Sequence, residues 1–289
     1  MSELYPTFNK LSYEDKIKIV IEKYLHLMDK IPNQILGFNT NVKVIKGTKK
    51  GFDTLTNYMT PYKTIYGNVC ALAHIFNCFE GCLQDSGMGK FNVNKVSRFR
   101  KIALFNDHPE IFKKILIKDI EKGIRKSKKN GHKLGVRING TSDIDVIKHF
   151  KDIIIKYPDV HFYDYTKIPK YLKKLQRMSN QLPNYHLTYS YSLSQKAQEY
   201  IKEATKTDHN IAMVFKNEDQ VNKLMSSKQK IKLYGKTYNL INGDNDDLRF
   251  LDPKNSIVLL RYKETRASDE SISNFVIDLN KLPKEIELV

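Results

Sequence analysis

Apolar residues recur first with a helical period and then in short runs along the second part of the chain. A helix is predicted over 109–130, opened by Pro109, with an apolar face of Ile111, Ile115, Leu116, Ile120 and Ile124. Four apolar runs follow, at 134–139, 160–166, 185–192 and 210–215, and each is followed by a helical pattern, at 144–156, 168–178, 194–206 and 218–226. Because strand–helix–strand alternation builds parallel sheets with right-handed crossovers, we predict an α/β fold of parallel β/α units, as a partial or complete β/α barrel.

The segments on either side of this alternation are less regular. An N-terminal amphipathic helix is predicted over 12–29, begun by the S-x-x-D pair Ser12 and Asp15 and ended before Pro32. Residues 35–68 are loop-like with short strands, 93–106 are helical, and 233–241, 256–263 and 273–279 are strand-like. No linker or internal repeat divides the chain. We therefore expect an N-terminal helical segment over 1–34 and a single α/β domain over 35–289 that contains the cysteines.

Charge adds a candidate partner to this picture. The chain has 49 basic and 32 acidic residues, a net charge of +17 and an isoelectric point near 9.5. Such an excess of positive charge favours the binding of polyanions, and of nucleic acid first. The competing explanation is that an AT-biased genome gives a composition rich in Lys, Ile and Asn. The candidate surface is the helix over 109–130, whose cations are Lys113, Lys114, Lys118, Lys122, Arg125, Lys126, Lys128 and Lys129.

Two absences bear on location. No apolar run reaches the ~20 residues that span a bilayer, so no membrane partner is expected. The N-terminal residues lack the charged and apolar regions of a signal peptide. We therefore expect a cytoplasmic protein, in which clustered cysteines are metal ligands or reactive thiols more often than disulfides.

The three cysteines of the chain all lie within thirteen positions. Seven residues separate Cys70 from Cys78, and three separate Cys78 from Cys82. Three thiolates so close in sequence can hold a 4Fe–4S cluster with one open iron, and we predict a metal or iron–sulfur site here. With His74, a Cys3His zinc site is the alternative. Small buried residues in a packed loop, or redox-active thiols, are the further alternatives.

Polar residues follow three successive predicted strands. Because parallel β/α units bring strand ends to one face, we expect these residues to share a cavity with the cysteines. The predicted catalytic residues are Asp143, Asp164 and Lys167. The predicted cofactor-binding residues at these strand ends are Asn139, Ser142, Tyr163 and Ser190. The purely structural alternatives are that Thr141, Ser142 or Asp143 caps the next helix, and that Asp164 only forms an ion pair with Lys167.

An acidic loop over 241–253 supplies further candidates. Asp244, Asp247 and Arg249 are predicted to bind the cofactor by closing the same face. The alternative is a Gly–Asp turn with a structural pair between Arg249 and Asp247 or Asp252. A calcium loop is excluded because its distal Glu is missing. Zincin, P-loop, nucleophile-elbow and dinucleotide-binding signatures are also missing.

Taken together, these strings resemble a known family. The ordered strings NVC…CLQDSGMGKFN, RINGTSD, FYDYTK, NYHLTYS and NGDNDDLRFLDP resemble the bacteriophage gene product 88 family over roughly residues 40 to 275. The resemblance implies a phage-encoded protein of the host cytoplasm but names no reaction. Three cysteines before a β/α series are also similar to radical S-adenosylmethionine enzymes, although the spacing departs from their C-x3-C-x2-C. That similarity implies a 4Fe–4S cluster that binds S-adenosylmethionine.

Three hypotheses about function follow. The first is an iron–sulfur enzyme on an incomplete β/α barrel, with S-adenosylmethionine as its second cofactor. The second is a zinc-stabilised protein that binds nucleic acid. The third is a phage accessory protein that binds a host protein without catalysis. Metal analysis of the anaerobically purified protein separates the first two, because one predicts iron and sulfide and the other zinc.

Overall fold

A computed structural model describes most of the chain. It covers residues 31–62, 68–76, 91–263 and 276–289, together with residues 15, 64, 78, 82 and 89. The N-terminal helix predicted over 12–29 lies outside the described residues except for Asp15, which is helical and exposed. In the described part, no helix is both long and apolar enough to cross a membrane.

The centre of the fold is one sheet. Within the described residues its ten strands follow the order β1-β2-β3-β4-β5-β6-β9-β8-β7-β10. Their bounds are Leu36–Phe38 (β1), Phe52–Asn57 (β2), Lys133–Arg137 (β3), His161–Thr166 (β4), Tyr185–Ser190 (β5), Asn210–Phe215 (β6), Ile231–Leu233 (β7), Lys236–Asn242 (β8), Ser256–Arg261 (β9) and Ile286–Leu288 (β10). Strands β2 to β6, β9 and β8 pair in parallel, and β1, β7 and β10 are antiparallel to their neighbours. The α/β prediction is therefore confirmed.

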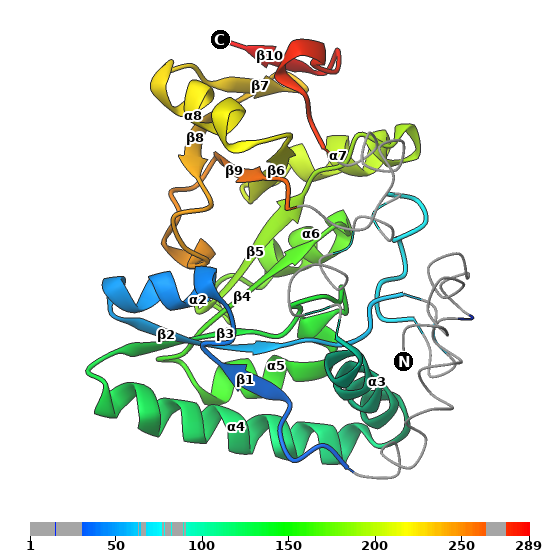
Figure 1. Cartoon of the computed structure of the whole chain (residues 1–289), viewed down its shortest axis with the longest axis vertical. Coiled ribbons are helices and arrows are strands. Elements are labelled where there is room, and N and C mark those ends of the chain that lie inside the picture. The colour runs from blue at the N-terminus through cyan, green and yellow to red at the C-terminus, as the bar shows by residue number, and fades with distance from the viewer. Residues whose placement is uncertain are drawn as a thin grey trace, which may run out of the picture.

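Helices connect the parallel strands. Their bounds are Val42–Lys46 (α2), Asn92–Asp107 (α3), Pro109–Lys129 (α4), Val146–Lys156 (α5), Pro169–Arg177 (α6), Gln198–Thr205 (α7) and Glu218–Ser226 (α8). Short 3-10 turns cover Gly47–Lys50, Gln195–Ala197, Arg249–Leu251 and Leu279–Lys281. Figure 1 shows α4 running along the lower edge of the molecule, beneath β1, β2 and β3.

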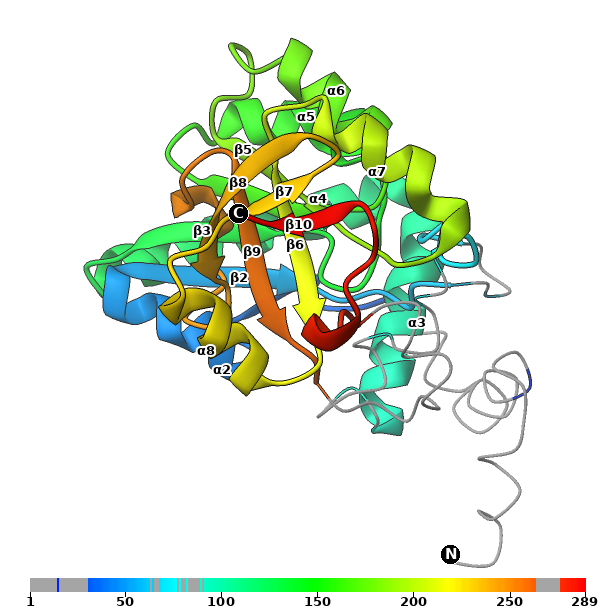
Figure 2. The same ribbon diagram turned by 90° about the horizontal axis from the view of Figure 1, so that it is seen from above.

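The strand order explains where the helices lie. Strands β2 to β6 are neighbours in the same order as in the chain, so successive right-handed crossovers place their helices on one face of the sheet. Figure 2 shows α5, α6 and α7 on one side of the strands and α2 and α8 on the other. Between the sheet and these helices lies an apolar core, in which Phe112 of α4 stacks on Phe150 of α5 with ring centroids 5.9 Å apart.

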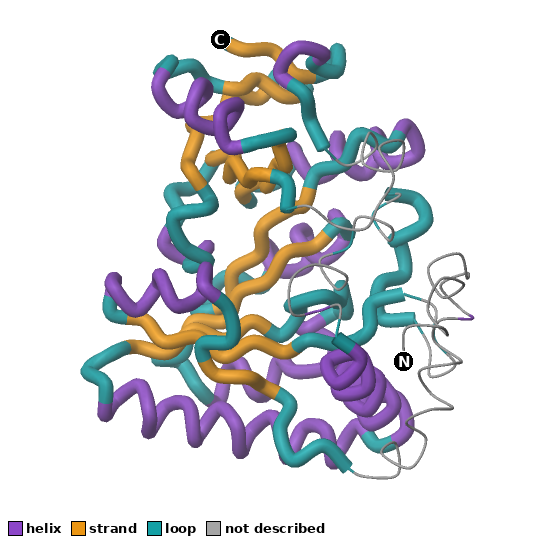
Figure 3. Tube along the Cα trace, viewed as in Figure 1, coloured by secondary structure: helices purple, strands orange, loops and turns teal. Residues whose placement is uncertain are grey.

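The sheet twists strongly but does not close. Figure 3 shows the strands as a continuous twisted band, and in Figure 2 β6 and β9 run across the direction of β2 and β3. Strands β1 and β10 form its two edges. Of the two forms predicted, the complete barrel is thus wrong for the described residues.

The face opposite α4 to α7, which we call the inner face, is covered by the loop between β8 and β9. The Phe250 ring stacks on the His161 ring with centroids 4.6 Å apart, and it meets the Phe52 ring edge-on at 5.1 Å. His161 and Phe52 are the first residues of β4 and β2. The loop therefore runs back from the end of β8 across the inner face, and its aromatic anchor packs at the strand starts because Phe250 finds an apolar surface there. That the loop closes the strand ends around a ligand stays a prediction.

Several element predictions also needed correction. The segment 233–241 is not one strand, because Tyr234 and Gly235 adopt positive φ (48° and 83°) and turn the chain between β7 and β8. The short strands predicted within 35–68 are present as β1 and β2, and an element that was not predicted there is the helix α2. In 273–279 the described part forms only an isolated bridge between Ile277 and Phe215, and residues 273–275 lie outside the described residues.

Candidate functional site

The segment that carries the cysteines, described at 69–76, 78 and 82, docks on the carboxyl ends of the parallel strands. The Val69 carbonyl accepts a hydrogen bond from the Asp143 backbone N–H at 2.7 Å, in the loop after β3. The Ser192 and Ser194 hydroxyls, just after β5, donate to the Phe76 and Ile75 carbonyls at 3.0 and 2.7 Å. This cysteine segment therefore spans the ends of β3 to β5, the edge at which α/β proteins bind ligands.

At this edge the charges of Cys78 and Cys82 act on Cys70. Cys70, Cys78 and Cys82 are all partly buried and none forms a disulfide. Burial raises the pKa of the Cys70 thiol well above its usual value, and the charges of Cys78, Asp143 and Cys82 raise it further. Burial likewise raises the pKa of Cys78. Among the described residues, however, no group of three or more His, Cys, Asp or Glu side chains has the arrangement of a formed metal site.

A buried lysine lies beside the thiols. Lys167 follows β4 and is only 9% exposed. Its ammonium donates hydrogen bonds of 3.1 Å to the Ser190 carbonyl, the Ser190 hydroxyl and the Tyr191 carbonyl. Burial lowers its pKa, whereas the nearby charges of Cys78, Cys70 and Asp143 oppose that change. In return, Lys167 lowers the pKa of both Cys70 and Cys78 and so favours their thiolate forms.

Asp143 joins the cysteine segment to Lys167. Its carboxylate Oδ2 accepts the Lys167 backbone N–H at 2.9 Å, while no hydrogen bond of normal geometry reaches the buried Oδ1. Burial raises the pKa of this carboxyl group to about 6, although the hydrogen bond from the Lys167 N–H stabilises the carboxylate and opposes the change. Asp143 does not cap α5, because the capping oxygen belongs to Asp145, which accepts the Lys148 N–H at 2.9 Å. The capping alternative for residues 141–143 is therefore wrong.

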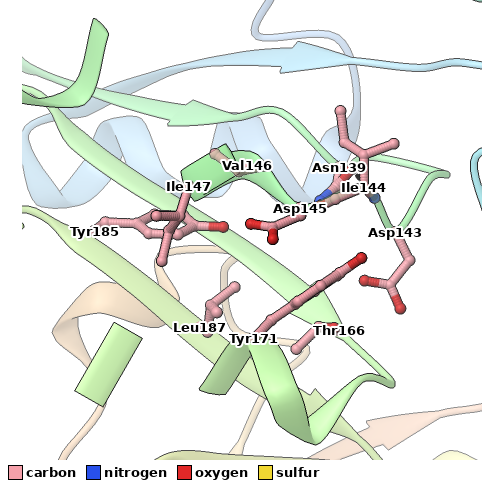
Figure 4. A pocket seen from close by; sticks show the side chains of 10 residues that line it. All are labelled: Asn139, Asp143, Ile144, Asp145, Val146, Ile147, Thr166, Tyr171, Tyr185 and Leu187. Atoms are coloured by element: carbon pink, nitrogen blue, oxygen red, sulfur yellow. Dashed lines mark hydrogen bonds between the residues drawn. The ribbon is translucent and has the colours of Figure 1, made fainter. Parts of the chain in front are cut away.

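Asn139, Ser142 and Asp164 fasten the loop after β3. The Asn139 carboxamide accepts from the Ser142 hydroxyl at 2.8 Å and donates to the Ile144 carbonyl at 3.0 Å. The Asn139 backbone N–H donates to Asp164, which also accepts the Tyr185 hydroxyl at 3.3 Å. Figure 4 shows Asn139 and Tyr185 among the side chains that surround the start of α5.

The space between those side chains is filled. No room for a water molecule remains among Asn139, Asp143, Thr166, Tyr185 and their apolar neighbours. The polar atoms of Asn139 and Ser142 are thus occupied within the loop, and their binding of a cofactor stays a prediction. Burial raises the pKa of Asp164, which is 0% exposed, to about 7.

The remaining predicted residues lie on the inner face. Tyr163 alternates with Asp164 along β4, so the two side chains point to opposite faces of the sheet. The Tyr163 hydroxyl donates to the Asp247 carboxylate at 3.1 Å, and the Arg137 guanidinium lies 3.1 Å from the same oxygen. Burial opposes ionisation of Asp247, but Arg137, Lys43 and Arg249 outweigh it and hold the pKa of Asp247 below its usual range.

Arg249 and Asp244 are also paired. Arg249 lies 3.2 Å from an Asp246 oxygen and 3.0 Å from an Asp252 oxygen, which confirms the structural pairing with Asp252. The Asp244 carboxylate lies 3.6 Å from the Lys43 ammonium. The structure thus gathers Asp143, Lys167 and Ser190 with the cysteines, and it places Tyr163, Asp244, Asp247 and Arg249 in a separate ionic network.

Sequence reasoning missed three participants. Arg137 sits inside an apolar strand run, and a lone cation in such a run is the signal of a buried ion pair. Ser194 binds the cysteine segment from a stretch that was predicted as helix. Lys43, which balances Asp247 and Asp244, comes from the short helix α2, and nothing in its local sequence marks it.

Comparison with known proteins gives one match. The family model described as Gene product 88 matches residues 35–278. No curated protein and no solved structure matches the chain. The first resemblance stated from the motifs is therefore confirmed, and the similarity to radical S-adenosylmethionine enzymes receives no support.

Proposed function

The chain belongs to the gene product 88 family, and we propose that this bacteriophage protein holds a 4Fe–4S cluster on Cys70, Cys78 and Cys82. The observation that supports the proposal is the docking of the cysteine segment over the ends of β3 to β5, with the buried Lys167 near enough for its charge to act on Cys70 and Cys78. In the host cytoplasm, where we place the protein, reducing conditions keep such thiols free.

The residues fit such a centre in their chemistry. Thiolates are the ligands that iron–sulfur clusters use, and three of them leave one iron without a protein ligand. Without metal, the raised pKa values of Cys70 and Cys78 keep both thiols protonated near neutral pH. Cluster binding must therefore release protons, and the Lys167 ammonium favours that release because it stabilises negative charge on both sulfurs.

Two further residues would act on a molecule bound at the open iron. The cluster, when bound, supplies an iron that can coordinate a small molecule such as S-adenosylmethionine. Asp143 places a buried carboxylate charge near Cys70 and Cys78, and that charge would favour a cationic group on the bound molecule. Lys167 would keep the Ser190 and Tyr191 carbonyls in place through its hydrogen bonds to them.

A zinc site is the competing form of the same proposal. His74 lies in the cysteine segment and is exposed, so it is accessible as a fourth ligand. A Cys3His zinc site would have a structural role and would leave no position for a substrate. Iron, sulfide and zinc content distinguish the two forms.

The test is metal analysis of the full chain purified anaerobically and reconstituted with iron and sulfide. We expect iron, sulfide and a broad visible absorption, and each of Cys70→Ala, Cys78→Ala and Cys82→Ala should lose most of the metal. His74→Ala is the matched control, because it should keep the cluster but lose a Cys3His zinc ion. The proposal fails if no metal binds, or if Cys78→Ala keeps its full metal content.

A further inference from the structure

Helix α4 presents a row of cations to solvent. Five of its exposed residues follow each other at intervals of four, four, three and four positions, which places them on one line along the helix. We call them the α4 cation stripe: Lys114, Lys118, Lys122, Arg125 and Lys129. At 1.5 Å of rise per residue the stripe is about 22 Å long. Figure 1 shows α4 on the outer edge of the molecule, with no labelled element beyond it.

The stripe is not explained by the stability of the helix. Cations favour the last turn of a helix because they interact with its dipole, which accounts for Lys129 but not for Lys114 or Lys118 in the first half. Like charges spaced four apart repel each other and destabilise a helix. Among the described residues, no carboxylate lies within ion-pair distance of any of the five cations.

Two of the three acidic residues of α4 are engaged elsewhere, and the third, Glu110, forms no ion pair with the stripe in the described part of the chain. The Asp119 carboxylate is buried and accepts the backbone N–H groups of Ile35 and Leu36 at 2.6 and 2.9 Å. Glu121 accepts the Tyr157 hydroxyl at 2.9 Å and lies 3.6 Å from the Lys156 ammonium of α5. The positive charge of the stripe is therefore available to an outside partner.

The composition of the exposed face indicates the class of partner. Apart from Pro109, every exposed residue of α4 is charged, so the helix has no apolar side chain to insert into a membrane. It also has no exposed aromatic residue on which single-stranded bases would stack. A straight line of cations matches a straight, evenly charged polymer, and duplex nucleic acid carries one charge per ~1.7 Å of axis.

From these features we infer that the α4 cation stripe binds the phosphate backbone of duplex nucleic acid. The contact does not read sequence, since cation–phosphate contacts position a protein without specifying bases. It is independent of the metal centre proposed above, because the stripe lies on the outer side of α4 and the cysteine segment lies at the strand ends.

The test measures binding of the full chain to a labelled 24-base-pair DNA of arbitrary sequence by fluorescence anisotropy. Five phosphate contacts predict that log K falls against log salt with a slope of about −4.5. Replacing all five stripe cations by Gln should weaken binding at least tenfold in low salt and flatten the slope.

A matched control removes the same charge from exposed lysines on separate elements. These are Lys148, Lys170, Lys196, Lys223 and Lys254, each replaced by Gln. The control should change affinity by less than threefold, and circular dichroism should show that both variants are folded. Equal weakening in the control would assign binding to net charge and overturn the inference. So would tighter binding to single-stranded DNA or to anionic vesicles than to the duplex, or no binding in low salt.

Discussion

Replacing Asp164 by Asn should make the protein more stable at alkaline pH. Asp164 is 0% exposed, and burial raises its pKa to about 7, although the Asn139 N–H and the Arg137 charge oppose the change. Asn reproduces the shape of the neutral acid: its Oδ1 still accepts the Asn139 N–H, and its amide group can donate to the Tyr185 hydroxyl oxygen. The substitution therefore removes a buried charge and keeps its hydrogen bonds.

The size of the effect follows from proton linkage. The carboxyl group has a pKa of 3.8 in its ordinary state and about 7 in the native protein, so the native state binds the extra proton between these values. The stabilisation is complete only below pH 3.8 and is lost as the pH rises through 7. A difference of about three pH units corresponds to about 4 kcal/mol, of which about 3 kcal/mol falls between pH 5 and 8.

The assay is urea unfolding of the metal-free protein, with reductant and chelator, at several pH values from 5 to 8. His149, His161, His186 and His209 have pKa values lowered by burial, so they contribute stability that rises with pH. The measured quantity is therefore the wild-type free energy of unfolding minus that of the variant. This difference should fall by about 3 kcal/mol from pH 5 to 8.

A partly buried carboxylate at the start of α5 provides the control. Asp145→Asn keeps the N-cap of α5, because Asn caps as well as Asp, and loses only the partly exposed contact with Lys174. Its effect should stay within about 1 kcal/mol at every pH. If Asp164→Asn is less stable than the wild type at pH 8, the ionised form is stabilised by its surroundings, and the reasoning is refuted.

Two further substitutions test the packing of the fold by urea unfolding. Arg137→Met leaves the buried Asp247 without its partner at 3.1 Å and should lower the free energy of unfolding by about 3 kcal/mol. Adding Asp247→Asn should restore much of that loss. If the effects of the two substitutions simply add, the pairing is contradicted. Gly140→Ala should cost at least 2 kcal/mol, because its Cβ would lie 2.3 Å from the Asn57 carbonyl oxygen; unchanged stability would show that the loop shifts freely.

The repeating part of the fold was predictable from local pattern. The run NIAMVF was predicted as a strand over 210–215 and forms β6 over the same residues, because a short apolar run between polar turns has no other stable place in an α/β fold. The run at 185–192 ends two residues early, at Ser190. Beyond that point Ser192 leaves the sheet to bind the cysteine segment, a tertiary contact that no local pattern contains.

The turn between β7 and β8 was missed for a local reason. A two-residue hairpin with positive φ at both positions is usually signalled by Asn-Gly or Asp-Gly, and here Tyr234 occupies the first position. Because the strand-like pattern continues on both sides of this turn, the segment 233–241 was predicted as one strand.

The candidate site was likewise predictable in one part and not in another. The order of the strands predicted that Asp143, Lys167 and Ser190 would gather at one edge, and their hydrogen bonds place them there. The same argument assigned Asp247 and Arg249 to that edge for cofactor binding, which stays a prediction, but it gave no account of the ion pairs that they form. Asp247 instead meets Arg137, 110 residues away in sequence, and only the folded loop across the inner face brings them together.

The cover of the inner face also bears on the order of folding. Residues 246–252 reach the inner face only after eight strands have left the ribosome, yet they pair with Arg137 of β3 and Tyr163 of β4. Until then Arg137 and Tyr163 lack the Asp247 carboxylate, and His161 and Phe52 lack the Phe250 ring. Contacts so distant in sequence slow folding and leave a long-lived intermediate. We expect the C-terminal part of the chain to limit the rate of folding during synthesis, and host chaperones to bind the protein at that stage.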